Sequence, residues 1–264
     1  MSPQSGRIRE EMRDPTVRFS GRVGHYARWR PDYPAALTGC LTEQGALKPL
    51  DVVADIGSGT GLLTAMLLRH GNRVYGVEPN REMREAAERE LAGLAGFTSV
   101  DGRAEATGLP DGSVDVVAAA QAFHWFDTQR CRAEFRRILR PGGSLVLVWN
   151  DRDTRSTPLM GAYESLLRTF GTDYHAVRRR GADEKEVEAF FGPGGCRRTV
   201  LPHRQDLDLE GLQGRLLSSS YVPAPGETGH DAMIREMESI FREHAEGGRV
   251  RFVYNTRVYH GPLD

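Results

Sequence analysis

Three glycines at alternate positions, Gly57, Gly59 and Gly61, carry the clearest chemical signal in this sequence. They follow directly on the apolar run 52–56, which contains Asp55, and leucines at helical spacing come next. Glycines between a strand and a helix let the backbone turn sharply and let a ligand lie against the main chain. Open α/β sheets bind ligands at the ends of such strands. The segment therefore predicts a cofactor site.

The spacing of the glycines distinguishes between two kinds of cofactor. A turn that binds NAD has the pattern G-x-G-x-x-G, with a small residue three positions after the second glycine. That position is Leu62 here, and the third glycine comes one residue earlier. Glu78 ends the next apolar run, where a carboxylate can accept both hydroxyls of a ribose. The pattern therefore indicates a cofactor that contains a ribose, and the spacing of the glycines disfavours NAD as that cofactor.

A second group of polar and aromatic residues, Gln121, Phe123, His124 and Trp125, comes directly after the apolar run 114–120. Such residues are unusual at the end of a buried strand. They would lie at the carboxyl edge of the sheet, beside the glycine-rich turn. His124 is the titratable member of the group, and imidazole is the side chain that changes charge near neutral pH.

These side chains need a scaffold, and the hydrophobic pattern predicts alternating strands and helices. Strands are expected at 52–56, 74–77, 97–100, 114–120 and 144–149. Helices are expected from Leu62 onward and over 81–94 and 130–140. Near-continuous apolar strands that alternate with helices indicate a parallel sheet covered on both faces.

The flanking segments extend this core. Leu37 and Leu41 predict a helix before it, and after it come expected helices at 159–170, 209–219 and 233–246, with strands at 197–201 and 250–259. The charged runs 178–180 and 183–188 are interpreted as solvated surface. The expected division is an N-terminal helical cap at 1–45, a cofactor-binding core at 46–150, a substrate lid with the sixth strand at 151–235, and a C-terminal helix and last strand at 236–264.

The composition of the 264 residues narrows the possible partners. The chain has 35 basic and 36 acidic side chains, a net charge of -1, and no basic stripe. Nothing in this balance favours nucleic acid or an anionic membrane. Cys40, Cys131 and Cys196 are too widely spaced for a disulfide framework or a metal cluster. Without a signal peptide or an apolar run of spanning length, the sequence predicts a cytoplasmic protein without a metal site.

The motif VVADIGSGTGLLT resembles the first motif of the class I S-adenosylmethionine-dependent methyltransferases. The resemblance implies a Rossmann-like α/β fold, in which a seven-stranded, mostly parallel sheet has helices on both faces and an antiparallel last strand. It also implies an N-terminal helical cap, a helical insertion after the fifth strand, and S-adenosylmethionine as cofactor. Asp55 would orient the methionine end of that cofactor, and the three glycines would form the floor beneath it.

The same resemblance extends to later segments. GRAEATGLPDGSVDVV is similar in spacing to the adenine-binding loop of the family, but Arg103 stands where many relatives carry Asp or a small hydroxyl residue. That position is therefore left out of the predicted site. The cofactor residues implied within the core are Asp55, Gly57, Gly59, Gly61, Glu78, Pro79, Ala104, Glu105 and Gln121.

The segments HYARWRPDYP, EFRRILRPGGSLVLVWN, SSSYVP and YNTRVY resemble a small-molecule branch that contains trans-aconitate methyltransferase-like proteins. In that branch an N-terminal helix closes over the cofactor. The resemblance implies that Tyr26 and Arg30 face the methionine carboxylate, a role that suits the bidentate fork of arginine. Tyr and Arg on an ordinary helix surface remain the alternative.

Methyl transfer is an in-line displacement, so the protein must chiefly align the acceptor with the methyl group at about 3 to 3.5 Å and exclude water. An ionised carboxylate needs no base, whereas a hydroxyl or carbon acceptor would gain from one. His124 is the candidate base, although it could equally tie its loop to the backbone. The acceptor is expected to contact His124, Trp125, Tyr174 and Tyr221, and each tyrosine could instead belong to the core.

Several functions compete with a small-molecule O-, N- or C-methyltransferase. No Asn-Pro-Pro-Tyr or Asp-Pro-Pro-Tyr motif of amino-directed nucleic-acid methylation occurs in the chain. A catalytically silent protein that binds S-adenosylmethionine as a regulatory or scaffold subunit remains open, as does an NAD-dependent oxidoreductase. The accepting atom and the oligomeric state are left open by the sequence.

Overall fold

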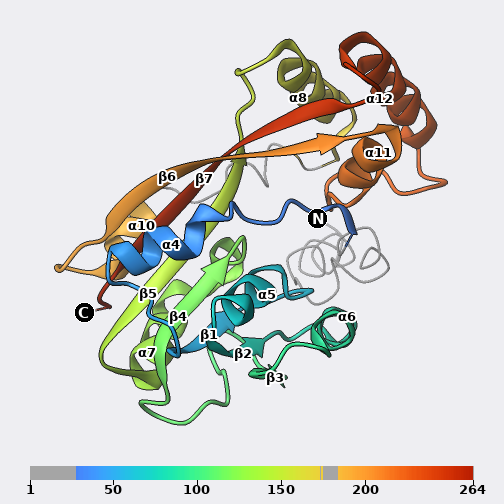
Figure 1. Cartoon of the computed structure of the whole chain (residues 1–264). Coiled ribbons are helices and arrows are strands. Elements are labelled where there is room, and N and C mark those ends of the chain that lie inside the picture. The colour runs from blue at the N-terminus through green and yellow to red at the C-terminus, as the bar shows by residue number, and fades with distance from the viewer. Residues whose placement is uncertain (1–27, 173, 175–183, 264) are drawn as a thin grey trace, which may run out of the picture.

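A twisted seven-stranded sheet is the centre of the molecule in the computed structural model, which describes residues 28–172, 174 and 184–263 (Figure 1). Its strand order is β3-β2-β1-β4-β5-β7-β6. The strands are β1 (Val52–Ile56), β2 (Arg73–Val77), β3 (Phe97–Val100), β4 (Val114–Ala120), β5 (Leu139–Arg152), β6 (Arg197–Leu207) and β7 (Val250–Gly261). The first five strands pair in parallel, and β7 runs antiparallel to both β5 and β6. The expected fold class is confirmed.

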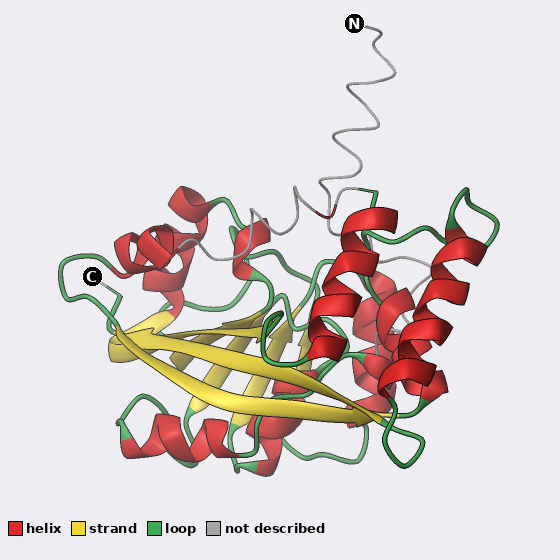
Figure 2. Ribbon diagram, turned by 90° about the horizontal axis from the view of Figure 1, so that it is seen from above, coloured by secondary structure: helices red, strands yellow, loops and turns green. Residues whose placement is uncertain are grey.

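Helices cover both faces of the sheet, as Figure 2 shows. They are α4 (Ala36–Glu43), α5 (Leu62–Arg69), α6 (Arg81–Leu91), the 3-10 helix η1 (Phe123–Trp125), α7 (Thr128–Ile138), α8 (Pro158–Phe170), α10 (Glu184–Phe191), α11 (Leu209–Leu217) and α12 (His230–His244). Side chains of Asn80 and Asp127 accept backbone N–H groups at the starts of α6 and α7. The two caps fix the residues at which α6 and α7 begin.

Strand β1 explains why the sheet must be covered on both sides. All five of its residues are buried, and successive side chains of a strand point to opposite faces. Val52, Ala54 and Ile56 pack in a cluster with α7 and α10. Val53 packs in a separate cluster with α4, α5 and α6. Two apolar layers, one on each face, therefore hold the parallel part of the sheet.

A third apolar cluster lies beyond the parallel strands. Strands β6 and β7 pair along 11 residues, and at one end they lie beside α8, α11 and α12 (Figure 1). Tyr163 of α8 and Phe252 of β7 meet edge to face there, with ring centroids 4.6 Å apart. The two long strands thus support helices that lie outside the parallel part of the sheet.

Most expected elements are present, with differences that have physical causes. Strand β5 spans Leu139 to Arg152 rather than 144–149. It begins at Leu139 because this residue pairs with Val114 of β4, and it ends at Arg152 because its pairing with β7 continues that far. Strand β6 continues to Leu207 because β7 pairs with it throughout. The charged run 183–188 includes the start of an unexpected helix, α10, whose charged side chains face outward while Val187, Phe190 and Phe191 are buried.

The expected boundary between residues 235 and 236 falls inside α12 (His230–His244). The proposed N-terminal cap is described only from residue 28, and α4 is its one described helix of more than a single turn. The run 178–180 lies outside the described residues. Among the described residues, none of the helices is long and apolar enough to cross a membrane.

Candidate functional site

The glycine-rich turn joins β1 to α5 in a conformation that favours glycine. Gly57, Gly59 and Gly61 all have positive φ, at +68°, +56° and +86°. A Cβ on Gly57 would lie 2.7 Å from the Cβ of Ala122, and one on Gly61 would lie 2.8 Å from Leu91. The turn is fastened to β2 because the N–H of Gly57 donates to the carbonyl of Val77 at 2.8 Å. Close packing and backbone conformation both require glycine at positions 57 and 61.

Asp55 holds the turn from beneath. Its side chain is 1% exposed, and its Oδ2 accepts a hydrogen bond from the hydroxyl of Thr64 at 2.6 Å. Burial raises the pKa of Asp55 to about 7, although the Thr64 hydrogen bond opposes this shift. The bond ties the end of β1 to the first turns of α5. Asp55 thus supports the glycine-rich turn and lies outside the lining of the cavity described below.

Glu78, directly after β2, is fixed by two backbone groups. Its Oε2 accepts the N–H of Gly59 at 3.0 Å, and its Oε1 accepts the N–H of Asn80 at 2.9 Å. Burial raises the pKa of this carboxyl, and the two N–H groups act in the opposite direction. Each carboxylate oxygen has a second lone pair that can accept another hydrogen bond. The Glu78 side chain is therefore held in one orientation and can still accept further hydrogen bonds.

A cavity of about 150 Å³ opens beside the glycine-rich turn and Glu78. Its lining consists of Gly57, Gly59, Glu78, Pro79, Met83, Arg103, Ala104, Glu105, Ala120, Gln121, Ala122, Trp125 and Phe126. Seven of the expected cofactor residues are thereby brought together, from four strand ends: Gly57, Gly59, Glu78, Pro79, Ala104, Glu105 and Gln121. Gly61 and Arg30 do not line the cavity, and Tyr26 lies outside the described residues.

Gln121 lines this cavity from a strained backbone position. It is one of two non-glycine residues with positive φ in the described chain, at +57°. Such a conformation costs on the order of 1 to 3 kcal/mol and persists where surrounding contacts impose it. Here its N–H donates to the carbonyl of Val148 at 2.9 Å, and its Nε2 donates to the carbonyl of Asn150 at 3.4 Å. The end of β4 is thus locked to β5 while Gln121 remains at the cavity wall.

The aromatic segment after β4 forms the short helix η1. Phe123 anchors it, because its buried ring packs edge to face on Phe190 with centroids 4.8 Å apart. Trp125 lines the cavity, whereas His124 is half-buried next to it and does not. The rings of His124 and Trp125 have centroids 4.9 Å apart. The candidate base is thus one residue removed from the cavity wall.

The expected lid tyrosines lie elsewhere, in the third apolar cluster. Tyr174 and Tyr221 have ring centroids 5.1 Å apart, and the Arg152 guanidinium donates to both hydroxyls, at 2.8 Å and 3.0 Å. Arg30 donates to the carbonyl of Ser218 at 3.1 Å, close to the same group. Tyr174 and Tyr221 therefore gather around Arg152, and Arg30 bonds to Ser218 near them; none of the three lines the cavity.

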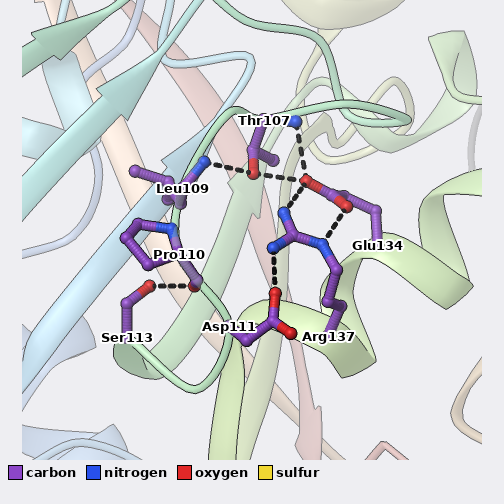
Figure 3. A network of polar contacts seen from close by, with 7 residues as sticks. All are labelled: Thr107, Leu109, Pro110, Asp111, Ser113, Glu134 and Arg137. Carbon is purple, nitrogen blue, oxygen red and sulfur yellow. Dashed lines mark hydrogen bonds and ion pairs between the residues drawn. The ribbon is translucent and has the colours of Figure 1, made fainter.

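A polar network that sequence reasoning missed holds the loop of Ala104 and Glu105 (Figure 3). Both the N–H and the hydroxyl of Thr107 donate to Glu134 Oε1, at 2.8 Å and 2.5 Å. Arg137 donates to both oxygens of Glu134, and its hydrogen bonds lower the pKa of that carboxyl to about 2. Arg137 also donates to Asp111 at 2.5 Å. The spacing of Glu134 and Arg137 on one helix was the available signal.

The residues around the cavity fit a nucleoside. Glu78 offers oriented acceptors for ribose hydroxyls, and Met83, Trp125 and Phe126 offer apolar surface for a base. Arg103, which was left out of the predicted site, also lines the cavity. The glycine-rich turn lets a ligand approach the main chain at the floor.

Comparisons with known proteins point to methyltransferases. Residues 54–147 match the model of a methyltransferase domain. An uncharacterized methyltransferase of Mycobacterium tuberculosis is 40% identical over 168 residues, which span 64% of this chain and 65% of that protein. One of Schizosaccharomyces pombe is 33% identical over 234 residues, 85% of this chain and 87% of that protein. A structure from Anaeromyxobacter dehalogenans, described as a "Putative Type II Methyltransferase", has a TM-score of 0.64 at 25% identity and covers 89% of this chain and 98% of that one.

Proposed function

We propose, since this chain belongs to the class I S-adenosylmethionine-dependent methyltransferase family, that it uses S-adenosylmethionine to methylate a small molecule. The observation that carries the proposal is the cavity at the glycine-rich turn, into which Glu78 presents a carboxylate held by two backbone N–H groups. The hydroxyls of a ribose require a fixed pair of hydrogen-bond acceptors. The groups attached to the ribose require a main chain that no side chain covers.

The cofactor residues have separate tasks in this proposal. Glu78 binds the ribose hydroxyls, and Ala104 and Glu105 lie beside the adenine. Gly57 and Gly59 give the methionine part access to the main chain. Asp55 acts through the turn that it supports, because it does not line the cavity. Roles for Tyr26 and Arg30 at the methionine carboxylate stay predictions from the family resemblance.

S-adenosylmethionine supplies a methyl group on a positively charged sulfur, which is electrophilic without further activation. The chain must therefore position the acceptor in line with that methyl group and keep water away. Gln121 and Trp125 suit this task because both stand at the cavity wall after β4. The rigid backbone of Gln121 keeps that wall in place.

His124 remains the candidate base for an acceptor that carries a proton. Its position next to Trp125 supports the proposal, while its absence from the cavity lining favours a role in holding η1. Turnover by a His124→Ala variant decides between the two. A loss of turnover with unchanged cofactor affinity supports the base. Near-normal turnover removes it.

The acceptor is proposed to bind under the lid formed by residues 151–235, on the side of the sheet edge where Tyr174 and Tyr221 lie. A small molecule is favoured over nucleic acid by the balanced charge of the chain. The resemblance to the trans-aconitate methyltransferase branch and the cytoplasmic location stay predictions, because the matched relatives are named only as methyltransferases.

A titration of the full chain with S-adenosylhomocysteine, followed by a methyl-transfer screen over small acids, amines and phenols, tests the function. Saturable binding together with transfer to one acceptor class supports the enzyme. Binding without any transfer would favour a silent regulatory or scaffold subunit. No binding, or displacement of the ligand by NADH, would contradict the proposal and revive the oxidoreductase alternative.

A further inference from the structure

A buried polar cluster lies among the helices supported by β6 and β7, outside the cofactor cavity. We call it the arginine–tyrosine cluster. Its members are Arg152, Tyr163, Glu164, Tyr174, Arg215, Ser218, Ser219, Tyr221 and Tyr254. Arg152 ends β5 and Arg215 belongs to α11, so residues far apart in sequence supply its two positive charges.

The two guanidiniums are surrounded mainly by neutral hydroxyls. Arg215 is 3% exposed, and it donates to Tyr254 at 3.1 Å and to the hydroxyls of Ser218 and Ser219 at 3.4 Å and 3.3 Å. Arg152 donates to two tyrosine hydroxyls and lies 3.7 Å from Glu164.

Within the described part of the chain, Glu164 is the one carboxylate that pairs with either guanidinium, and it pairs with Arg152. It also accepts the hydroxyl of Tyr174 and pairs with Arg168, which is mostly exposed. With its tyrosines protonated, the cluster therefore holds two buried positive charges against one negative charge. Burying an unpaired charge is costly, so a second negative group is needed to balance the cluster.

Two buried polar atoms of the cluster have unused hydrogen-bonding capacity. The hydroxyl of Tyr163 and the Nε of Arg152 make no hydrogen bond with any part of the chain that the structure describes. Tyr163 is fully buried, and the Arg152 guanidinium lies 5.8 Å from the centre of its ring. Buried polar atoms of native proteins are normally paired, and an oxygen ligand would satisfy both atoms.

The cluster lies next to the edge of the sheet at which the cofactor cavity opens. Gln121, in the cavity lining, donates to the carbonyl of Asn150, and Arg152 follows two residues later on the same strand. The Arg152 side chain is 14% exposed, in contrast to the nearly sealed Arg215. Arg152 is thus the member that a ligand at this edge reaches first.

We propose that Arg152 and Arg215, with the hydroxyls of Tyr163 and Tyr221, bind an anionic oxygen group of the methyl acceptor, a carboxylate or a phosphate. The inference rests on the proposed methyltransferase function and assigns a chemical class to its substrate. Guanidiniums recognise both groups through paired, charge-assisted hydrogen bonds. Anchoring this group at the cluster leaves the rest of the acceptor to extend toward the cofactor cavity.

The lowered pKa of Tyr221 also supports the binding of an anion at the cluster. Burial on its own would raise the pKa of this hydroxyl, but Arg152 and Arg215 outweigh it and lower the pKa to about 7. The charged and titratable groups that face Tyr221 are Arg30, Arg152, Tyr163, Tyr174 and Arg215. The electrostatic field of the cluster therefore favours a negatively charged oxygen. A bound anion would supply that negative charge in place of the ionised Tyr221 side chain.

Calorimetric titration with sodium succinate and with inorganic phosphate, at constant ionic strength and with saturating S-adenosylhomocysteine, tests the site. We expect saturable binding of one of the two anions, and the better binder identifies a carboxylate or a phosphate as the natural group. Arg152→Gln should weaken that binding at least tenfold. Tyr163→Phe should weaken it several-fold while the protein stays folded, because it removes a hydroxyl with no partner in the described chain.

Arg168→Gln is the matched control, since Arg168 pairs with Glu164 from the exposed side of α8 and should leave anion affinity unchanged. Failure of both anions to bind a protein that binds S-adenosylhomocysteine would overturn the anion site alone. Equal affinity of wild type, Arg152→Gln and Tyr163→Phe would overturn it as well. Failure to bind S-adenosylhomocysteine would instead contradict the proposed function, whatever the anions do.

Discussion

Asp55 and Glu78 show how two carboxylates of one site acquire different tasks from their surroundings. Asp55 is sealed beneath the glycine-rich turn and receives one hydroxyl. Glu78 lines the cavity and receives two backbone N–H groups. The first is suited to holding the turn and the second to binding a ligand. Both lie at the carboxyl ends of neighbouring strands, where a local motif is enough to identify them in sequence.

Asp55→Asn should flatten the pH dependence of stability in the ligand-free protein. The folded state holds the Asp55 proton up to about pH 7, against 3.8 for an ordinary Asp, so the stabilisation is full below pH 4 and is lost as pH rises to 7. Between pH 5 and pH 8 the wild type should lose about 3 kcal/mol of unfolding free energy that the variant keeps. Urea unfolding at both pH values measures the difference. Parallel losses in the two proteins would contradict the role given to burial.

At the scale of the elements, helix α7 holds the loop between β3 and β4 in position. Thr107 is fully buried, donates to Glu134 and accepts the N–H of Leu109 at 3.2 Å (Figure 3). The lining residues Ala104 and Glu105 lie just before it in the chain. A loop held this way can present the main chain to a ligand without a regular element of its own.

Thr107→Val should loosen this loop. The variant leaves the buried N–H of Leu109 without its acceptor, which costs about 1 to 3 kcal/mol. We expect a lower midpoint in thermal unfolding and several-fold weaker binding of S-adenosylhomocysteine. Ser113→Ala is the control, because Ser113 bonds Pro110 at the exposed side of the loop. Equal cofactor affinity of the two variants would show that the Thr107 bonds do not position the site.

The elements also show where sequence reasoning succeeds and fails. Strands β1, β3 and β4 were predicted with their observed bounds, because each is a compact apolar or β-branched run. Helix α10 was missed because only Val187, Phe190 and Phe191 mark its buried side within a charged segment. The length of β6 depends on its partner β7, which lies more than 40 residues later in the chain.

At the scale of the whole molecule, the cavity at the glycine-rich turn and the arginine–tyrosine cluster lie at one edge of the sheet. The cofactor cavity could be predicted because its residues follow strands in short motifs. The arginine–tyrosine cluster could not, since it forms only when β5, α8, α11 and β7 come together. Tyr174 and Tyr221 were predicted as lid residues, but their arginine partners carry no motif. The long antiparallel strands that support α8, α11 and α12 bring the cluster to this edge (Figure 1).

The affinity of Glu78→Gln for S-adenosylhomocysteine tests the central claim most directly. The amide group has one oxygen in place of two, so it cannot accept both backbone N–H groups and both ribose hydroxyls. Calorimetry should show a loss of about 2 kcal/mol, roughly thirtyfold in affinity. Glu90→Gln, at an exposed position of α6, should bind as the wild type does. Wild-type affinity in a folded Glu78→Gln protein would contradict the proposed ribose contact and the cofactor site built around it.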